Sequence, residues 1–164
     1  MSVRKMIAEK LMWETLKRWK KTSPDLDRIA FLKTVPFFNE LSNWQLHKVG
    51  AIVFERNYEA GELIFEQGQP GAALFLITEG QVSVEIYKDH FTATLAVLEK
   101  GAFFGELALL DEAPRSASAR AIEPTKTIAL YRNDLTRLIS TDPDTASHIF
   151  RALARIVGDR LRST

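Results

Sequence analysis

The feature that most restricts the fold of this chain is a series of short apolar or alternating segments between residues 51 and 132. Turn residues separate these segments, among them Gly61, Gly68, Gly71, Gly80 and Gly101. Short segments bounded by glycine are typical of β-strands joined by tight turns. We predict strands at 51–58, 62–67, 73–79, 81–88, 91–99, 117–123 and 126–132. Because no helix long enough for a crossover lies between them, the strands are predicted to form an antiparallel sandwich or barrel.

Helical patterns precede these strands. Residues 3–21 contain no Gly or Pro and end at the sequence TSPD, residues 22–25, which predicts a first helix, with a second helix directly after it. Pro36 predicts an extended break. Beyond it, Ser42 followed three residues later by Gln45 predicts a capping box and another short helix.

Helices are also predicted after the strands. One is expected at Asn133–Ser140 and another from Asp142, where Asp-Pro-Asp supplies an N-cap, a proline at the first helical position and an early negative charge. The chain is therefore expected to be mainly β with flanking helices. Its 164 residues suit one core. We place an N-terminal helical extension at 1–30 and the main domain, with the C-terminal helices, at 31–164.

The composition argues against several kinds of site. The chain has no Cys, which removes disulfides, thiolate nucleophiles and Cys-based metal sites, and its three histidines lack further ligands at metal spacing. It has no GxxxxGK[ST] sequence and no His–acid dyad at motif spacing. We therefore predict no catalytic residue, no metal, no cofactor and no enzymatic activity. Since no run of 18 apolar residues and no secretory signal is found, a cytoplasmic location is expected.

One segment combines charge with small side chains. In FGELALLDEAPRSASARA, residues 104–121, Glu106 and Arg115 lie among glycine, alanine and serine. Residues 105–110 can form about one helical turn, whose N–H groups favour an anion, and Gly105 allows its close approach. The planar guanidinium of Arg115 can bind two phosphodiester oxygens. Glu106 would repel phosphate but can accept a sugar hydroxyl, so a ligand with both a phosphate and a ribose is predicted.

These residues resemble the cyclic nucleotide-binding domains of protein kinase A regulatory subunits, cyclic nucleotide-gated channels and the bacterial catabolite activator protein. The similarity covers about residues 30 to 160. It rests on FGELAL at 104–109 followed by RSA at 115–117, within a segment that we call the cassette (residues 104–117). It rests equally on the turn GQPGAA at 68–73, which leads through LFLI to Gly80.

The resemblance implies an eight-stranded antiparallel jelly-roll barrel with a C-terminal helical lid. It implies that Glu106 binds the ribose 2'-hydroxyl and that Arg115 binds the cyclic phosphate. It also implies that backbone groups around Leu107, Ala108 and Ser116 complete the site. The predicted ligand-binding residues are Gly105, Glu106, Leu107, Ala108, Arg115, Ser116 and Ala117. The predicted lid residues, which share one apolar face of the last helix, are Ile149, Phe150, Leu153 and Val157. The alternatives for this face are a permanently docked helix and a dimer interface. Phe65 stands where the family usually has a smaller aliphatic residue, and we expect it to affect packing rather than the site.

The predicted ligand is cyclic AMP, with cyclic GMP as the alternative. Family members that favour cyclic GMP often have threonine directly after the cassette arginine and those that favour cyclic AMP have alanine, whereas this chain has Ser116.

We expect a stand-alone bacterial regulatory module whose helical surface changes on binding and acts on a partner protein. One alternative is a structural module that dimerises through its terminal helices without ligand. Another is a member that has lost the ligand and pairs Glu106 with Arg115.

Charge gives little support for other partners. The 22 Lys and Arg nearly balance the 21 Asp and Glu, and no helix-turn-helix follows the last predicted helix, so DNA binding is not expected. The predicted helix at 3–21 has seven basic and two acidic residues, which favours an anionic membrane. Its two apolar rows favour packing against the barrel or a second subunit more strongly, so membrane binding is not expected either.

Overall fold

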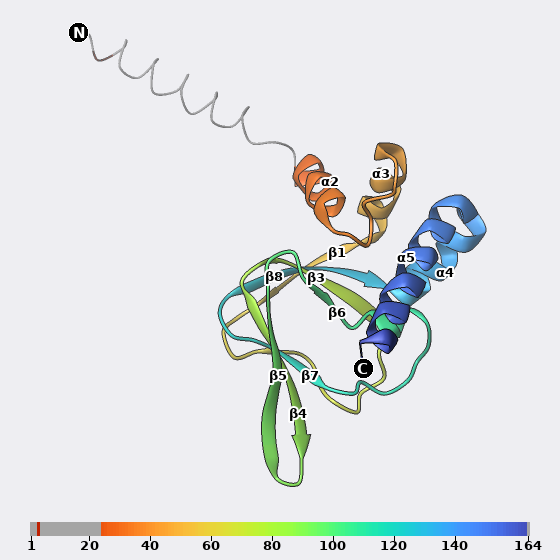
Figure 1. Ribbon diagram of the computed structural model, residues 1–164. Coiled ribbons are helices and arrows are strands. Elements are labelled where there is room, and N and C mark those ends of the chain that lie inside the picture. The colour runs from red at the N-terminus through yellow and green to blue at the C-terminus, as the bar shows by residue number, and fades with distance from the viewer. Residues whose placement is uncertain (1–2, 4–23, 164) are drawn as a thin grey trace.

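The protein is described by a computed structural model that covers Val3 and residues 24–163 (Figure 1). The helix predicted at 3–21 lies outside these residues, apart from Val3. The described helices are α2 (Pro24–Thr34), α3 (Asn43–Ile52), α4 (Arg132–Thr141) and α5 (Pro143–Arg162), with the short 3-10 helix η1 (Glu106–Leu109). Among them, no helix has the length and apolar character needed to cross a membrane.

Two four-stranded antiparallel sheets form the body of the molecule. The strands are β1 (Phe54–Tyr58), β2 (Leu63–Phe65), β3 (Ala73–Glu79), β4 (Gln81–Lys88), β5 (Phe91–Glu99), β6 (Phe103–Phe104), β7 (Ser118–Ala121) and β8 (Thr125–Tyr131). One sheet has the order β1-β8-β3-β6 and the other β2-β7-β4-β5. The predicted jelly-roll fold, with antiparallel strands and flanking helices, is confirmed. The β4–β5 hairpin projects from the body on the side away from the helices (Figure 1).

Strand β3 separates two hydrophobic clusters because successive side chains of a strand point to opposite faces. Leu74 and Leu76 belong to the cluster that the helices cover, whereas Phe75 and Ile77 belong to the cluster inside the barrel. Strand β8 repeats the pattern in register, since Leu76 pairs with Ile128. Burial of both faces explains why β3 reads as a continuous apolar run rather than as an alternation.

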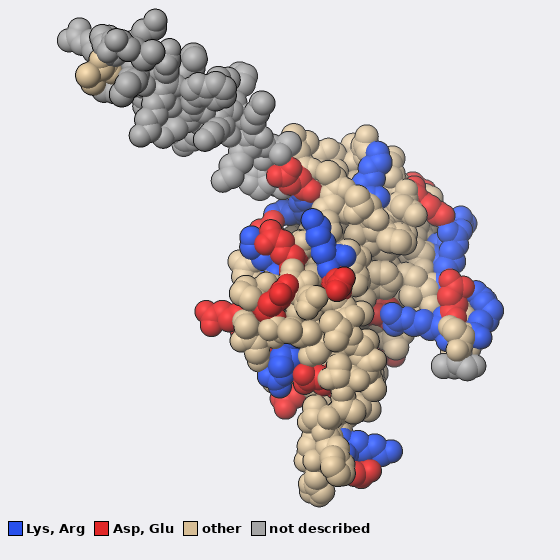
Figure 2. Space-filling view, turned by 60° about the vertical axis from the view of Figure 1, so that its left-hand side comes forward, with Lys and Arg blue, Asp and Glu red and all other residues tan. Residues whose placement is uncertain are grey.

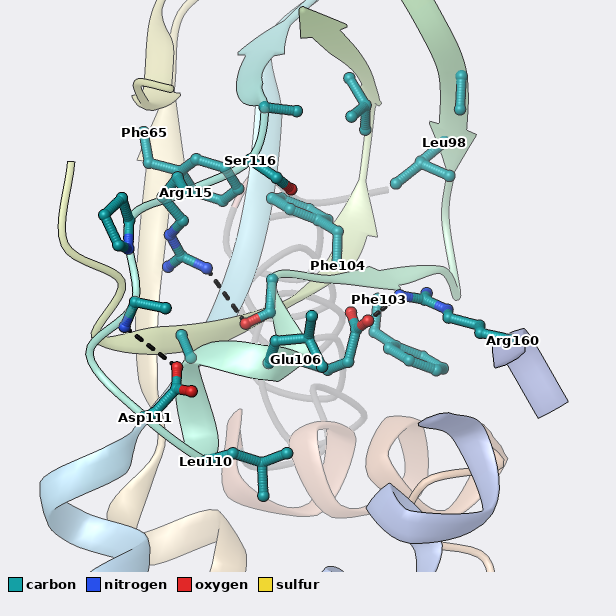
Figure 3. Close-up of a pocket in the computed structure, with 18 residues that line it drawn as sticks. Phe65, Leu98, Phe103, Phe104, Glu106, Leu110, Asp111, Arg115, Ser116 and Arg160 are labelled. Carbon is teal, nitrogen blue, oxygen red and sulfur yellow. Dashed lines mark hydrogen bonds and ion pairs between the residues drawn. The ribbon is translucent and has the colours of Figure 1, made fainter. Parts of the chain in front are cut away.

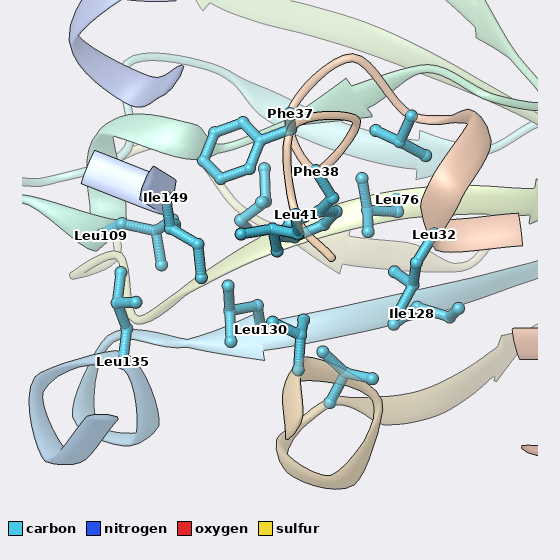
Figure 4. Close-up of a cluster of buried hydrophobic side chains, with 14 of the residues drawn as sticks. Leu32, Phe37, Phe38, Leu41, Leu76, Leu109, Ile128, Leu130, Leu135 and Ile149 are labelled. Carbon is cyan, nitrogen blue, oxygen red and sulfur yellow. The ribbon is translucent and has the colours of Figure 1, made fainter. Parts of the chain in front are cut away.

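The flanking helices complete the outer cluster (Figure 4). Leu32 of α2, Leu135 of α4 and Ile149 of α5 are fully buried there against the β3–β8 face. Helix α5 begins at the predicted N-cap, where the Asp142 carboxylate accepts the backbone N–H of Thr145 at 3.3 Å. The apolar face of α5 is therefore covered by the core in this structure.

Local details correct several predicted boundaries. The predicted capping box is present: the Ser42 N–H donates to Oε1 of Gln45 at 2.9 Å, and the Gln45 N–H donates to Oγ of Ser42 at 3.2 Å. The helix that it starts continues to Ile52, so the strand expected at 51–58 begins only at Phe54. Pro36 lies in consecutive turns rather than in an extended break. Strand β6 was not predicted, because two residues are too short to show a pattern. The division predicted between residues 30 and 31 falls within α2 and stays a prediction.

Candidate functional site

The cassette borders a cavity of about 460 Å³ at the end of the barrel next to α5 (Figure 3). All seven predicted ligand-binding residues line it: Gly105, Glu106, Leu107, Ala108, Arg115, Ser116 and Ala117. Gly105 precedes η1 with φ 75° and ψ 21°, a left-handed conformation that glycine adopts without strain. Residues of η1 and residues 115–117, which follow it in the sequence, therefore line the same cavity. The structure brings the predicted residues together and leaves their ligand as a prediction.

Arg115 reaches from the far end of the cassette back to its beginning. Its Nη1 donates to the Gly105 carbonyl oxygen at 3.2 Å, and its Nη2 donates to the Ala73 carbonyl oxygen at 2.8 Å. Its Nε is buried and has no hydrogen-bond partner among the described residues. Burial lowers the pKa of Arg115, and the positive charge of Arg132 lowers it further. A partly buried cation with an unused donor is a natural binding group for an anion.

Glycine at two positions makes room for this guanidinium. A Cβ on Gly105 would lie 2.6 Å from Nη1 of Arg115. A Cβ on Gly71 would lie 2.8 Å from the Cβ of Ala108 and 3.2 Å from Cζ of Arg115. The contacts at 2.6 and 2.8 Å are too close for a carbon atom, so glycine at these two positions is a steric requirement of the position of the arginine.

Phe65 belongs to the site, which corrects the expectation that it would affect packing only. Its ring centroid lies 4.0 Å from Cζ of Arg115, a cation–π contact, and its side chain lines the cavity. Phe75 and Phe104 stack with ring centroids 5.5 Å apart, and Phe65 lies 5.9 and 5.8 Å from them. The guanidinium therefore lies on an aromatic base, which restricts its orientation.

Glu106 is 2% exposed and forms an ion pair with Arg160 near the end of α5 (Figure 3). The pairing of Glu106 with Arg115, considered from the sequence, is absent from this structure, where Arg115 donates to carbonyl oxygens instead. Sequence reasoning did not identify Arg160, because a basic residue in the last turn of a helix has an ordinary explanation in the helix dipole. A carboxylate has two oxygens, so Glu106 can accept a further hydrogen bond beside this ion pair.

The predicted lid residues do not line the cavity. Ile149 and Leu153 are buried in the outer core, and Phe150 and Val157 pack against the same core while partly exposed. Helix α5 reaches the cavity through Arg160. That the four residues close over a ligand stays a prediction, and in this structure they anchor α5.

The loop before β3 supports the second half of the cassette. The N–H of Gly68 donates to the Arg115 carbonyl oxygen at 2.8 Å, and the N–H of Arg115 donates to the Gln69 carbonyl oxygen at 2.7 Å. Pro70 of this loop and Pro114 of the cassette form an isolated antiparallel β-bridge. The two sequence motifs are therefore parts of one structural unit.

The remaining walls give the cavity an apolar end. Side chains from β4, β5 and β6 contribute Val84, Ala96, Leu98, Phe103 and Phe104. Within the turn, the N–H of Ala108 donates to the Gly105 carbonyl oxygen at 3.2 Å, while Leu107 is exposed and leaves its side chain at the rim. The cavity can thus hold a small molecule with an anionic group, a hydroxyl group and an apolar body. No cluster of three or more potential metal ligands occurs in the described part of the chain.

Comparison with known proteins gives the same picture. The family model described as cyclic nucleotide-binding domain matches residues 55–142. The cyclic AMP receptor protein of Thermus thermophilus is 39% identical over 127 residues, which are 76% of this chain and 58% of that protein. A cAMP-dependent protein kinase regulatory subunit of Aspergillus fumigatus is 36% identical over 70% of this chain, which corresponds to 27% of its own length. The chain thus spans less than two thirds of both relatives.

A solved structure resembles the chain over most of both lengths. The N-terminal domain of a transcriptional regulator from Streptomyces coelicolor superposes with a TM-score of 0.74 and 30% sequence identity. The match covers 81% of this chain and 94% of that domain. The likeness therefore extends beyond the residues that the family model matches.

Proposed function

Because the chain belongs to the family of cyclic nucleotide-binding domains, we propose that its cavity binds cyclic AMP and that the bound ligand controls contact with another protein. The family is one of regulatory binding domains rather than of catalytic ones. The observation that carries the proposal is Arg115, which borders the same cavity as the buried Glu106 and whose buried Nε lacks a hydrogen-bond partner among the described residues.

The cyclic phosphate would lie against Arg115. Two of the five guanidinium N–H groups already donate to carbonyl oxygens, and the Nε–H with an adjacent N–H remains for two phosphate oxygens. Glu106 would accept the ribose 2'-hydroxyl while its ion pair with Arg160 is retained or exchanged. Backbone groups of Gly105, Leu107 and Ser116 would complete the contacts to phosphate and sugar.

The nucleobase would occupy the apolar end of the cavity. Val84, Ala96 and Leu98 offer it no charged group, and their packing area favours a flat ring system. Ser116 is exposed at the rim and carries the one hydroxyl of the cassette, so it is the residue proposed to discriminate between bases. We favour cyclic AMP, since serine lacks the threonine methyl group that would orient its hydroxyl toward a guanine amino group.

Ligand occupancy would be transmitted through α5. Arg160 links the last turns of this helix to Glu106, so a ribose that rearranges Glu106 also changes the position of α5. An effector protein that contacts α5 would sense this change, and a homodimer formed through the terminal helices is a second possible recipient. Positive and negative side chains are interspersed on the face in Figure 2, which supports neither DNA nor an anionic membrane as the partner.

Calorimetric titration tests the proposal directly. Protein freed of bound nucleotide is titrated separately with cyclic AMP, cyclic GMP and 5'-AMP. We expect cyclic AMP to bind more tightly than cyclic GMP, and 5'-AMP to bind far more weakly, because an acyclic phosphate has a different charge and shape. Tighter binding of cyclic GMP would overturn the base preference alone.

The competing function is a structural module that dimerises without ligand. No heat with either cyclic nucleotide, together with a dimer whose size in solution is the same with and without them, would favour this module and reject the proposed sensor.

A further inference from the structure

Arg132 donates hydrogen bonds to three backbone carbonyl groups, which belong to the cassette and to the loop that supports it. Its Nη1 donates to the carbonyl oxygens of Gly71 and Ala108, both at 2.8 Å, and of Asp111 at 2.7 Å. Its Nη2 lies 3.3 Å from a carboxylate oxygen of Glu112. The side chain of Arg132 is 17% exposed, and its hydrogen bonds to Gly71 and Ala108 are partly buried, whereas those to Asp111 and Glu112 are exposed.

The three carbonyl oxygens carry partial negative charges and would repel one another without a cation between them. They come from the loop before β3, from η1 and from the turn that follows η1. The backbone N–H of Arg132 also donates to the carbonyl oxygen of Ala72 at 2.8 Å. One residue therefore holds the cassette against the loop at several points.

The position of Arg132 in its own helix gives no reason for a cation there. Arg132 is the first residue of α4, and the N-terminus of a helix carries a partial positive charge that disfavours a cation. It also lies close enough to Arg115 to lower the pKa of that residue. Two unfavourable electrostatic interactions are thus offset by the contacts with the carbonyl groups.

We propose that Arg132 is a positioning residue for ligand binding. Arg132 and Arg115 connect the same two segments, residues 71–73 at the start of β3 and residues 105–111 around η1, from different sides. Arg115 does so in the cavity, whereas Arg132 does so outside it and touches no ligand. By fixing Ala108 and Asp111, Arg132 keeps the turn in the form in which Gly105 and Arg115 face the cavity. The part that concerns ligand rests on the function proposed above.

The first test needs no ligand. Hydrogen exchange is measured on the full chain and on Arg132→Gln, Arg132→Lys and the control Arg137→Gln, which changes an exposed arginine of the same helix paired with Asp134. In Arg132→Gln the amides of residues 105–111 are expected to exchange about tenfold faster, while those of β3 and β8 are unchanged. Arg132→Lys should restore much of the protection, because an ammonium group also donates to three acceptors.

The second test measures cyclic AMP affinity of the same proteins by calorimetry. Arg132→Gln should weaken binding by about tenfold or more, Arg132→Lys by less, and Arg137→Gln not measurably. If Arg132→Gln keeps the affinity of the parent, or loses affinity while exchange of residues 105–111 stays the same, the positioning role is wrong. If the parent binds no cyclic nucleotide, the proposed function fails, and the exchange measurement still decides whether Arg132 orders the cassette.

Discussion

At the scale of single residues, we expect substitutions of Arg115 and of Glu106 to weaken ligand binding by different amounts. Arg115→Ala removes the cation that lies among carbonyl oxygens and an aromatic ring, while Arg160, a second cation at the cavity, is paired with Glu106. We expect cyclic AMP binding to weaken by about 2 to 5 kcal/mol. Glu106→Gln keeps an acceptor for the ribose hydroxyl and loses an ion pair whose arginine is 58% exposed, so its effect should be smaller.

Calorimetric titration of both variants measures these losses. Arg120→Ala is the matched control, because Arg120 also binds a backbone carbonyl, that of Gly61 at 2.7 Å, but does not line the cavity. Circular dichroism should show that all three variants keep the fold. Equal affinity of Arg115→Ala and the parent would mean that the cassette was assigned wrongly.

Residues of the site differ in how far the sequence reveals them. Gly105, Glu106 and Arg115 belong to one contiguous motif, and the structure places all of them at one cavity as predicted. Phe65 and Arg160 contact this motif from distant parts of the chain, and a single sequence contains no signal for a contact formed by tertiary packing.

At the scale of elements, local signals predicted helix starts well. Ser42 with Gln45 and Asp142 with Pro143 cap their helices through neighbours in sequence, and the structure shows the caps where they were expected. The first strand was predicted to start at residue 51, whereas β1 starts at Phe54. The predicted start is too early because Ala51 and Ile52 suit a strand as well as the end of a helix. The side on which α5 packs could not be read from its apolar face, which fits a lid and a core helix equally well.

The burial of α5 restricts where a lid can move. Ile149 and Leu153 are 0% and 1% exposed, so displacement of the whole helix would open the outer core. We therefore expect ligand to increase amide protection most strongly in residues 156–162, near Arg160, and least around Ile149. Hydrogen exchange with and without cyclic AMP measures this difference.

Truncation after Gly158 provides the reciprocal test, because it removes Arg160 and leaves the buried residues in place. Binding of cyclic AMP should weaken by about fivefold or more if the end of α5 and the ligand are coupled. Undiminished affinity of the truncated chain, with equal protection of residues 156–162 in both states, would identify α5 as a fixed part of the core.

At the scale of the whole molecule, the site lies between the cassette, the loop at 68–71 and α5, and a bound ligand would contact more than one of these parts. The cassette joins the two sheets, the loop at 68–71 pairs with its second half, and α5 contacts Glu106. A ligand bound to these parts is lost on unfolding, so binding should raise the free energy of unfolding. At a concentration one hundred times Kd the increase is about 2.7 kcal/mol.

For a chain of this length, that increase corresponds to a rise in Tm of roughly 5 to 10 °C, which differential scanning calorimetry can measure. Cyclic AMP should produce the rise and 5'-AMP far less of it. The same ligand should leave the Tm of Arg115→Ala nearly unchanged, because that variant keeps the sheets and helices but lacks the cation at the phosphate position. A zero shift for the ligand-free parent with millimolar cyclic AMP and cyclic GMP would refute nucleotide binding. A rise of equal size in Arg115→Ala would instead place the ligand elsewhere on the molecule.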